Sequence, residues 1–160
     1  MKRFLTVMAA GFLGMFLCAS VVSAAEVKTE YFTLTLPAPW KQPQPPQKAN
    51  GAVSATVQNT KDGTAVNITV TPVSLSAKDL ATQTLSNMKK GGFTVSDPKA
   101  VGDFYMGEFT KGPAKGVCYF GSNGKVGGVA TILGVTLDTG KELLSKNFKP
   151  ADDKLFPTSF

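Results

Sequence analysis

Few side chains of this sequence could take part in chemistry, and the clearest candidate is the thiol of Cys118. A thiol becomes a nucleophile when a nearby cation lowers its pKa, and a lysine such as Lys115 or Lys125 could supply that cation. Cys118 also stands between Val117 and Tyr119 in an apolar stretch, where a free cysteine is usually a small core residue. We expect the core role and keep a thiol-dependent enzyme that uses Cys118 as the alternative.

The composition removes most other kinds of catalytic or metal site. The 160 residues include no histidine, the commonest general base and metal ligand, so a Ser–His–acid triad is excluded. Zinc sites need several cysteine or histidine ligands, and the segment NTKDGT lacks the alternating carboxylates of a calcium loop. We therefore expect no catalytic residue besides the alternative at Cys118, no metal and no cofactor.

The stretch YFTLTLPAPWKQPQPP, residues 31–46, combines aromatic side chains with five prolines. Pro37 has no N–H to give to a neighbouring strand, so we expect the strand to end at Leu36. Trp40, the only tryptophan, follows within a few residues, and a tryptophan just past a strand end typically closes one end of a core. Ligand stacking is the alternative role. Tyr31 and Trp40, with the proline loop, are our candidate binding residues.

The N-terminal residues have the three parts of a secretory signal peptide. Two basic residues precede an apolar run from Phe4 to Leu17, and small residues follow at positions 23–25. This run is shorter than the roughly 18 residues expected of a membrane span. We expect a signal peptide over residues 1–25, cut after Ala24 or Ala25, and a single domain over residues 26–160.

Export sets the compartment in which the mature chain works. A cleaved signal predicts a periplasmic or secreted protein that has no transmembrane segment after cleavage. A lipid anchor at Cys18 is the alternative, and it is disfavoured because Leu17 is bulky where a lipoprotein signal carries a small residue. Cleavage leaves Cys118 as the only cysteine, so we expect no internal disulfide.

The charge of the mature chain limits the partners that it can bind. After removal of Lys2 and Arg3, 15 lysines stand against 11 acidic residues, which gives a net charge of +4 and no arginine. Phosphate recognition commonly uses the two-point grip of the guanidinium group. We therefore expect no nucleic acid as partner, and look instead to a protein of the cell envelope or an apolar small ligand.

Alternating apolar residues predict strands in the first half of the mature chain. The segments 32–36, 53–58 and 66–71 each place apolar side chains on one face and polar ones on the other. The second and third are joined by NTKDG, whose Asp62–Gly63 pair suits a tight turn. We expect these two strands to form an antiparallel hairpin.

A helical period follows in SLSAKDLATQTLSNMKKGG. Ser76, with Asp79 three residues on, predicts an N-terminal cap, and Lys89 and Lys90 suit the helix C-terminus. Gly91 is expected to end the helix in the left-handed conformation. The apolar stripe predicted to face the core consists of Ala77, Leu80, Ala81, Leu85 and Met88.

The second half predicts a hairpin, a helix and a short tail. Asn123–Gly124 separates two runs with apolar residues on both faces, which indicates central strands. Thr139-x-x-Glu142 resembles a capping box, so we expect a helix to begin near Thr139, to end at Pro150 and to cover the other face of the sheet.

The expected fold class is α+β, with a mainly antiparallel twisted sheet of about six or seven strands flanked by two helices. The apolar residues Leu155 and Phe156 near the C-terminus should pack back against this sheet.

The motifs FTLTLPAPW, YFGSNGK and LFP, with the order of elements between them, resemble the bacterial DcrB-like proteins and, more distantly, the PsbP-like extrinsic photosystem proteins. The similar order covers nearly all of residues 31–156. The resemblance implies an exported protein with an antiparallel sheet flanked by helices, and it brings no catalytic residues with it. We expect a non-catalytic periplasmic accessory or binding protein.

Overall fold

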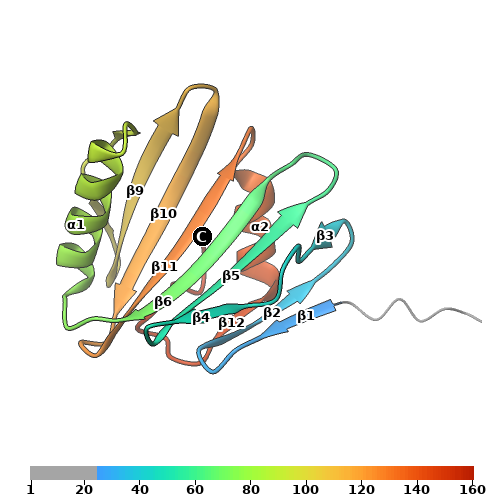
Figure 1. The fold of residues 1–160 in the computed structure, drawn as a ribbon, viewed down its shortest axis with the longest axis horizontal. Coiled ribbons are helices and arrows are strands. Elements are labelled where there is room, and N and C mark those ends of the chain that lie inside the picture. Colours follow the sequence, from blue (N-terminus) through green and yellow to red (C-terminus); the bar gives the residue numbers. More distant parts are fainter. Residues whose placement is uncertain (1–24) are drawn as a thin grey trace, which may run out of the picture.

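The computed structural model describes residues 25–160 of the chain. The predicted signal peptide up to Ala24, including the alternative lipid site at Cys18, lies outside the described residues. In chain order the elements are β1 (Ala25–Lys28), β2 (Phe32–Leu36), β3 (Trp40–Lys41), β4 (Gln47–Ala49), β5 (Ala52–Asn59), β6 (Ala65–Pro72), α1 (Ala77–Lys90), β7 (Thr94–Val95), β8 (Lys99–Val101), β9 (Phe104–Lys111), β10 (Ala114–Ser122), β11 (Val126–Gly134), α2 (Asp138–Asn147) and β12 (Phe148–Pro150) (Figure 1).

The predicted α+β fold class is confirmed, because two helices flank a large antiparallel sheet. The main path of this sheet has the order β3-β5-β6-β11-β10-β9-β7, with the short strands β4 and β8 paired to β5 and β9. All pairings between the described strands are antiparallel. A second sheet of three strands, β1-β2-β12, was not predicted.

The two helices lie on opposite faces of the large sheet, as Figure 1 shows for α1 in front and α2 behind. Alternation along β11 gives the reason: Gly127 faces Leu80 of α1, whereas Ile132, on the opposite face, contacts Gly140 of α2. The small sheet shares one apolar core with α2 and the large sheet. A second core forms beneath α1 around Leu85 and Phe120.

Helix α1 begins after Ser76 and ends at Lys90 as predicted, but the left-handed residue that follows it lies one position later than predicted. Ser76 Oγ accepts a hydrogen bond from the amide of Asp79 at 3.1 Å, which caps the N-terminus. The prediction of a left-handed Gly91 is wrong, because its φ is −78° and its amide still donates to the helical carbonyl of Asn87. Gly92 takes the left-handed conformation instead, with φ of +84°.

Helix α2 begins near Thr139 as predicted, but its predicted cap and its predicted end are wrong. The residue before its first turn is Leu137, which has no side-chain cap, and the capping box at Thr139 does not form. At the other end the helix stops at Asn147 because Phe148 turns to extended backbone and pairs with Leu34 of β2. Pro150 therefore belongs to a strand, and a tertiary pairing decides where the helix ends.

Several other local predictions are confirmed. Strand β2 stops at Leu36, the hairpin of β10 and β11 turns at Asn123–Gly124, and these two strands are central in the sheet. Asn123 Oδ1 accepts from the Val126 amide at 2.9 Å and so closes the turn. Leu155 and Phe156 are buried against the core. None of the helices within residues 25–160 is long and apolar enough to cross a membrane.

Candidate functional site

The position of Trp40 follows from the two short pairings on either side of the proline tract. The chain turns back after β2, where the Trp40 amide donates to the Pro37 carbonyl at 2.9 Å. The two-residue strand β3 then pairs with β5 and sets Trp40 directly opposite Asn59. Directly opposed residues of antiparallel strands place their side chains on the same face. Trp40 and Asn59 are therefore neighbours, although 19 positions separate them in the sequence.

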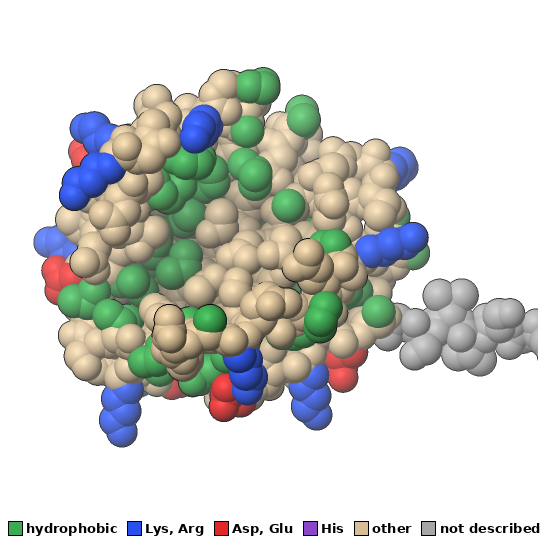
Figure 2. All heavy atoms as spheres, in the orientation of Figure 1, with side chains coloured by type: hydrophobic (Ala, Val, Ile, Leu, Met, Phe, Trp, Pro, Cys, Tyr) green, Lys and Arg blue, Asp and Glu red, His purple; other side chains and the backbone are tan. Residues whose placement is uncertain are grey.

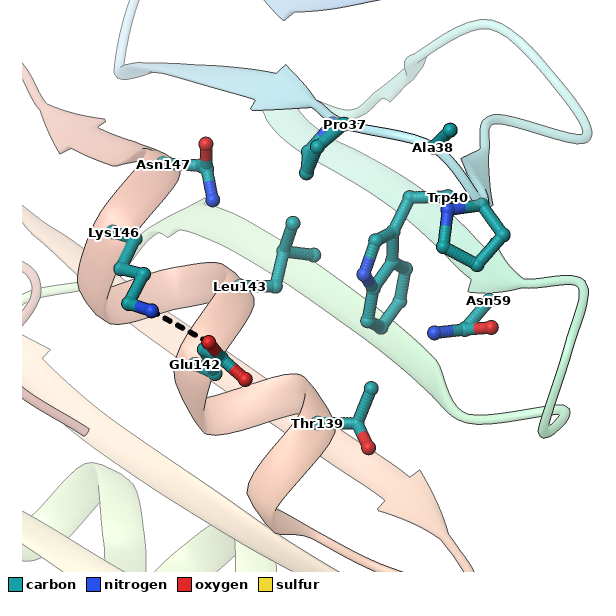
Figure 3. A pocket seen from close by; sticks show the side chains of 10 residues that line it. Pro37, Ala38, Trp40, Asn59, Thr139, Glu142, Leu143, Lys146 and Asn147 are labelled. Atoms are coloured by element: carbon teal, nitrogen blue, oxygen red, sulfur yellow. Dashed lines mark hydrogen bonds and ion pairs between the residues drawn. The ribbon is translucent and has the colours of Figure 1, made fainter.

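A pocket of about 420 Å³ lies between this turn and α2, and we call it the Trp40 pocket (Figure 3). Its apolar part comes from the turn and from one residue of the helix, and its polar part comes from β5 and the outer side of α2. Ligand sites typically combine an apolar lining with a few convergent polar groups. The lining residues are Pro37, Ala38, Pro39, Trp40, Asn59, Thr139, Glu142, Leu143, Lys146 and Asn147.

Trp40 both closes the core and lines the pocket. Its side chain is 7% exposed, as expected for a residue that closes one end of the core. Figure 3 shows the edge of its indole that carries the nitrogen on the side of Leu143. The two roles considered for Trp40 are therefore compatible, because the buried part of the ring packs and the remaining edge is available to a ligand.

Asn59 is the polar residue most deeply placed in the Trp40 pocket, with 4% of its surface exposed. Its Oδ1 accepts hydrogen bonds from the amides of Lys61 at 2.8 Å and Asp62 at 3.4 Å, which fixes the orientation of the side chain. The amide nitrogen consequently points the other way, toward Trp40 (Figure 3). Asp62 in turn accepts from the Thr64 amide at 2.8 Å, and this bond lowers the pKa of Asp62.

The two charged residues of the Trp40 pocket neutralise each other at its rim. Lys146 Nζ and Glu142 Oε1 lie 2.6 Å apart on successive turns of α2, and their side chains are 69% and 64% exposed. The hydrogen bond from Lys146 lowers the pKa of the Glu142 carboxyl. Exposed pairs of this kind contribute little to stability, so the pair matters here because it leaves no unbalanced charge at the pocket.

Tyr31, the other candidate binding residue, does not reach the Trp40 pocket. It precedes β2, whereas the turn that carries Trp40 follows β2, so the two aromatic residues lie at opposite ends of the strand. Tyr31 is half-buried against the main core, and its carbonyl accepts from the amide of Ala151 at 2.8 Å. The proline loop after Trp40 lies apart as well, where Pro43 and Pro45 line a smaller cavity beside Ser54.

Cys118 has the surroundings of a core residue. Its side chain is 2% exposed beneath α1, and burial raises the pKa of its thiol to about 11. The nearest polar partner is Thr131 Oγ1, 3.4 Å from the sulfur. Lys115 is three positions away on β10, so strand alternation sends its side chain to the other face. These surroundings disfavour a nucleophilic thiolate.

The described part of the chain contains no candidate metal site. Within residues 25–160, no three side chains of the types His, Cys, Asp and Glu lie together in an arrangement that could hold a metal ion.

The open part of the large sheet, on the side of α1, is a second surface worth comparing with the pocket. Charged side chains stand round the rim of this face and leave its middle free, as Figure 2 shows. Its polar atoms already bond to one another: Asn67 Nδ2 donates to Ser54 Oγ at 3.1 Å and to Thr56 Oγ1 at 2.8 Å, and Thr69 Oγ1 donates to Asn67 Oδ1 at 2.9 Å. The Trp40 pocket, whose donors point inward, therefore offers more directed recognition.

Sequence patterns missed Asn59 and the residues of α2 that complete the pocket. One signal was present, because Asn59 continues the alternation of Val53, Ala55 and Val57 and so occupies an inward-facing position where a polar residue is unusual. The pairing of Trp40 with Asn59 rests on a strand of two residues that no periodicity can reveal. Searches against models of protein families and among curated proteins find no match for this chain.

Proposed function

We propose that this chain is an exported, non-catalytic binding protein that acts through the Trp40 pocket. The observation that carries the proposal is the pocket itself: an indole edge, a leucine and prolines surround a space of about 420 Å³ that a nearly buried asparagine amide faces. This volume lies in the range of sites for small molecules, which is roughly 300–1,000 Å³. The occupant that suits this lining best is an apolar small ligand.

Binding explains the lining of the Trp40 pocket better than catalysis does. General acid–base catalysis needs a group that can gain or lose a proton near the working pH. The only titratable side chains among the described lining residues are Glu142 and Lys146, which are paired with each other at the rim. The alternative enzyme based on Cys118 has no observation in its favour, because that thiol is buried and its pKa is raised.

The proposal also includes export of the protein and its relationship to the DcrB-like and PsbP-like proteins. The pattern of residues 1–25 supports a cleaved signal peptide and a periplasmic or secreted location. The resemblance to DcrB-like and PsbP-like proteins is supported by the order of the described elements, in which a strand, a hairpin and a helix precede the central strands and a late helix. An accessory role toward a protein of the cell envelope is the second form that this function could take.

The test is native mass spectrometry of the protein extracted gently from its own envelope fraction. We expect the mature chain, cut after Ala24 or Ala25, to carry a small molecule that is lost on mild activation. A retained protein in place of the small molecule would replace ligand binding by the accessory role. A bare chain under every gentle condition would contradict the proposal. The same spectrum distinguishes cleavage from lipid attachment at Cys18.

A further inference from the structure

The Trp40 pocket contains hydrogen-bond donors that have no acceptor among the described residues, and two of them belong to its buried residues Asn59 and Trp40. One is Asn59 Nδ2, since the Oδ1 of the same amide is committed to the amides of Lys61 and Asp62. The other is Trp40 Nε1, on the indole edge that Figure 3 shows facing Leu143. Neither nitrogen is among the fully enclosed polar atoms without a partner, and both belong to residues that line the pocket.

From these donors we infer that the pocket selects a neutral ligand whose apolar body carries a carbonyl-type acceptor, and that Asn59 determines this specificity. The inference rests on the proposed function and adds the chemical class of the ligand. A carbonyl oxygen has two lone pairs and no proton, so it matches donors and offers nothing to an acceptor. A ligand without such an oxygen would bury Asn59 Nδ2 unpaired, which is costly.

The charge at the pocket explains why the ligand should be neutral. Glu142 and Lys146 already neutralise each other, and no other charged side chain is among the described lining residues. A carboxylate or an ammonium group would lose its hydration on entry and would meet no free counter-charge. A neutral carbonyl loses less hydration and regains a hydrogen bond from a fixed donor.

The role of Asn59 in specificity can be tested by a substitution that removes its hydrogen-bond donor and keeps its acceptor. In Asn59→Asp one carboxylate oxygen can still accept from the amides of Lys61 and Asp62, while the other replaces the donor that faces the pocket. Asn87→Asp is the matched control, because it makes the same chemical change at an exposed position of α1 outside the lining of the Trp40 pocket. The two variants add the same charge.

The probes are acetophenone and its isosteric hydrocarbon α-methylstyrene, in which a CH₂ group replaces the carbonyl oxygen. Each is titrated into the ¹⁵N-labelled mature protein and followed by NMR at the indole N–H of Trp40, the only tryptophan of the chain. We expect Asn59→Asp to weaken acetophenone binding roughly two- to tenfold, as for one lost hydrogen bond, relative to its effect on α-methylstyrene. Asn87→Asp should change the two affinities by the same factor.

The wild-type protein provides a test that does not depend on the stability of a variant. Acetophenone should move the side-chain amide protons of Asn59 downfield, and α-methylstyrene should not. Equal responses to the two probes, or an equal loss of both in Asn59→Asp, would overturn the inference and leave the proposed function standing. Failure of both probes to move the Trp40 signal would count against the pocket as a ligand site, and so against the proposed function as well.

Discussion

The contact between Gly140 and the sheet sets how closely α2 can approach, and Gly140→Ala should therefore destabilise the protein. A methyl group at residue 140 would lie closer than 3.0 Å to Cγ2 of Ile132 and 3.3 Å from Cγ2 of Val66. Both neighbours are fully buried in β11 and β6. Their γ-methyl groups are fixed to a branched Cβ, so neither can move aside without a shift of backbone or helix.

The expected loss of stability in Gly140→Ala is the difference between two opposing effects. Alanine favours a helix over glycine by about 1 kcal/mol, whereas forcing an extra methyl group into a packed core costs about 1–3 kcal/mol. Because the new methyl would meet Ile132 well inside normal contact distance, the cost belongs in the upper half of that range. We expect Gly140→Ala to lower the free energy of unfolding by about 1–2 kcal/mol net of the helix term.

Urea denaturation measures this change, with far-UV circular dichroism and Trp40 fluorescence as independent signals. The matched test is Gly140→Ala combined with Ile132→Leu, since leucine has no methyl group on its β-carbon and leaves room for the new one. The double variant should be more stable than the sum of the single effects predicts, by about 1 kcal/mol. A Gly140→Ala protein as stable as the wild type would refute the close packing of α2 on β11.

Three further predictions concern Cys118, Asp152 and Ser76. Iodoacetamide at neutral pH should label Cys118 slowly in the native protein and rapidly in urea, because burial raises the pKa of the thiol to about 11; rapid native labelling would contradict its burial. The Asn123 amide, 2.7 Å away, lowers the pKa of Asp152, so this bond stabilises the fold above about pH 4 and is lost as the pH falls through the lowered pKa. In Asp152→Asn the free energy of unfolding should therefore fall less steeply as the pH is lowered below about 4. The same pH dependence as in the wild type would show that Asp152 does not contribute. Ser76→Ala removes the cap of α1 and should cost about 1 kcal/mol in urea denaturation, whereas Ser76→Thr should cost less.

Local chemistry explains which parts of the fold were predictable. The end of β2 before Pro37 and the start of α1 at Ser76 depend on groups within a few residues, and the sequence displays those groups. The start of α2 is different, because Thr139 has the right spacing from Glu142 but the helix begins one residue earlier. Packing of Gly140 against Ile132 can decide that register, and a capping motif contains no information about it.

The small sheet and the pocket were not predictable because they depend on pairings between distant segments. Strand β12 consists of three residues and ends in Pro150, which alone predicts the end of a helix and not a strand. It pairs with β2, more than 100 positions earlier in the chain. Trp40 was recognised as a candidate from its isolation and its neighbouring prolines. Its partner Asn59 could be identified only from the register in which β3 pairs with β5.

The walls of the Trp40 pocket come from the turn after β2, from the end of β5 and from α2, so a ligand there would hold three separate segments together. A ligand that binds only the folded protein stabilises it by about 2.7 kcal/mol at a concentration one hundred times its dissociation constant. By the same linkage, a change that displaces one of these segments should weaken ligand binding. Gly140 does not line the pocket, yet it sets the depth of the helix that supplies Leu143 and Thr139. If α2 is displaced, the space beside Trp40 becomes wider. The ligand then loses contacts with the helix and binds more weakly. Stability and binding should therefore fall together in Gly140→Ala and be regained together when Ile132→Leu is added.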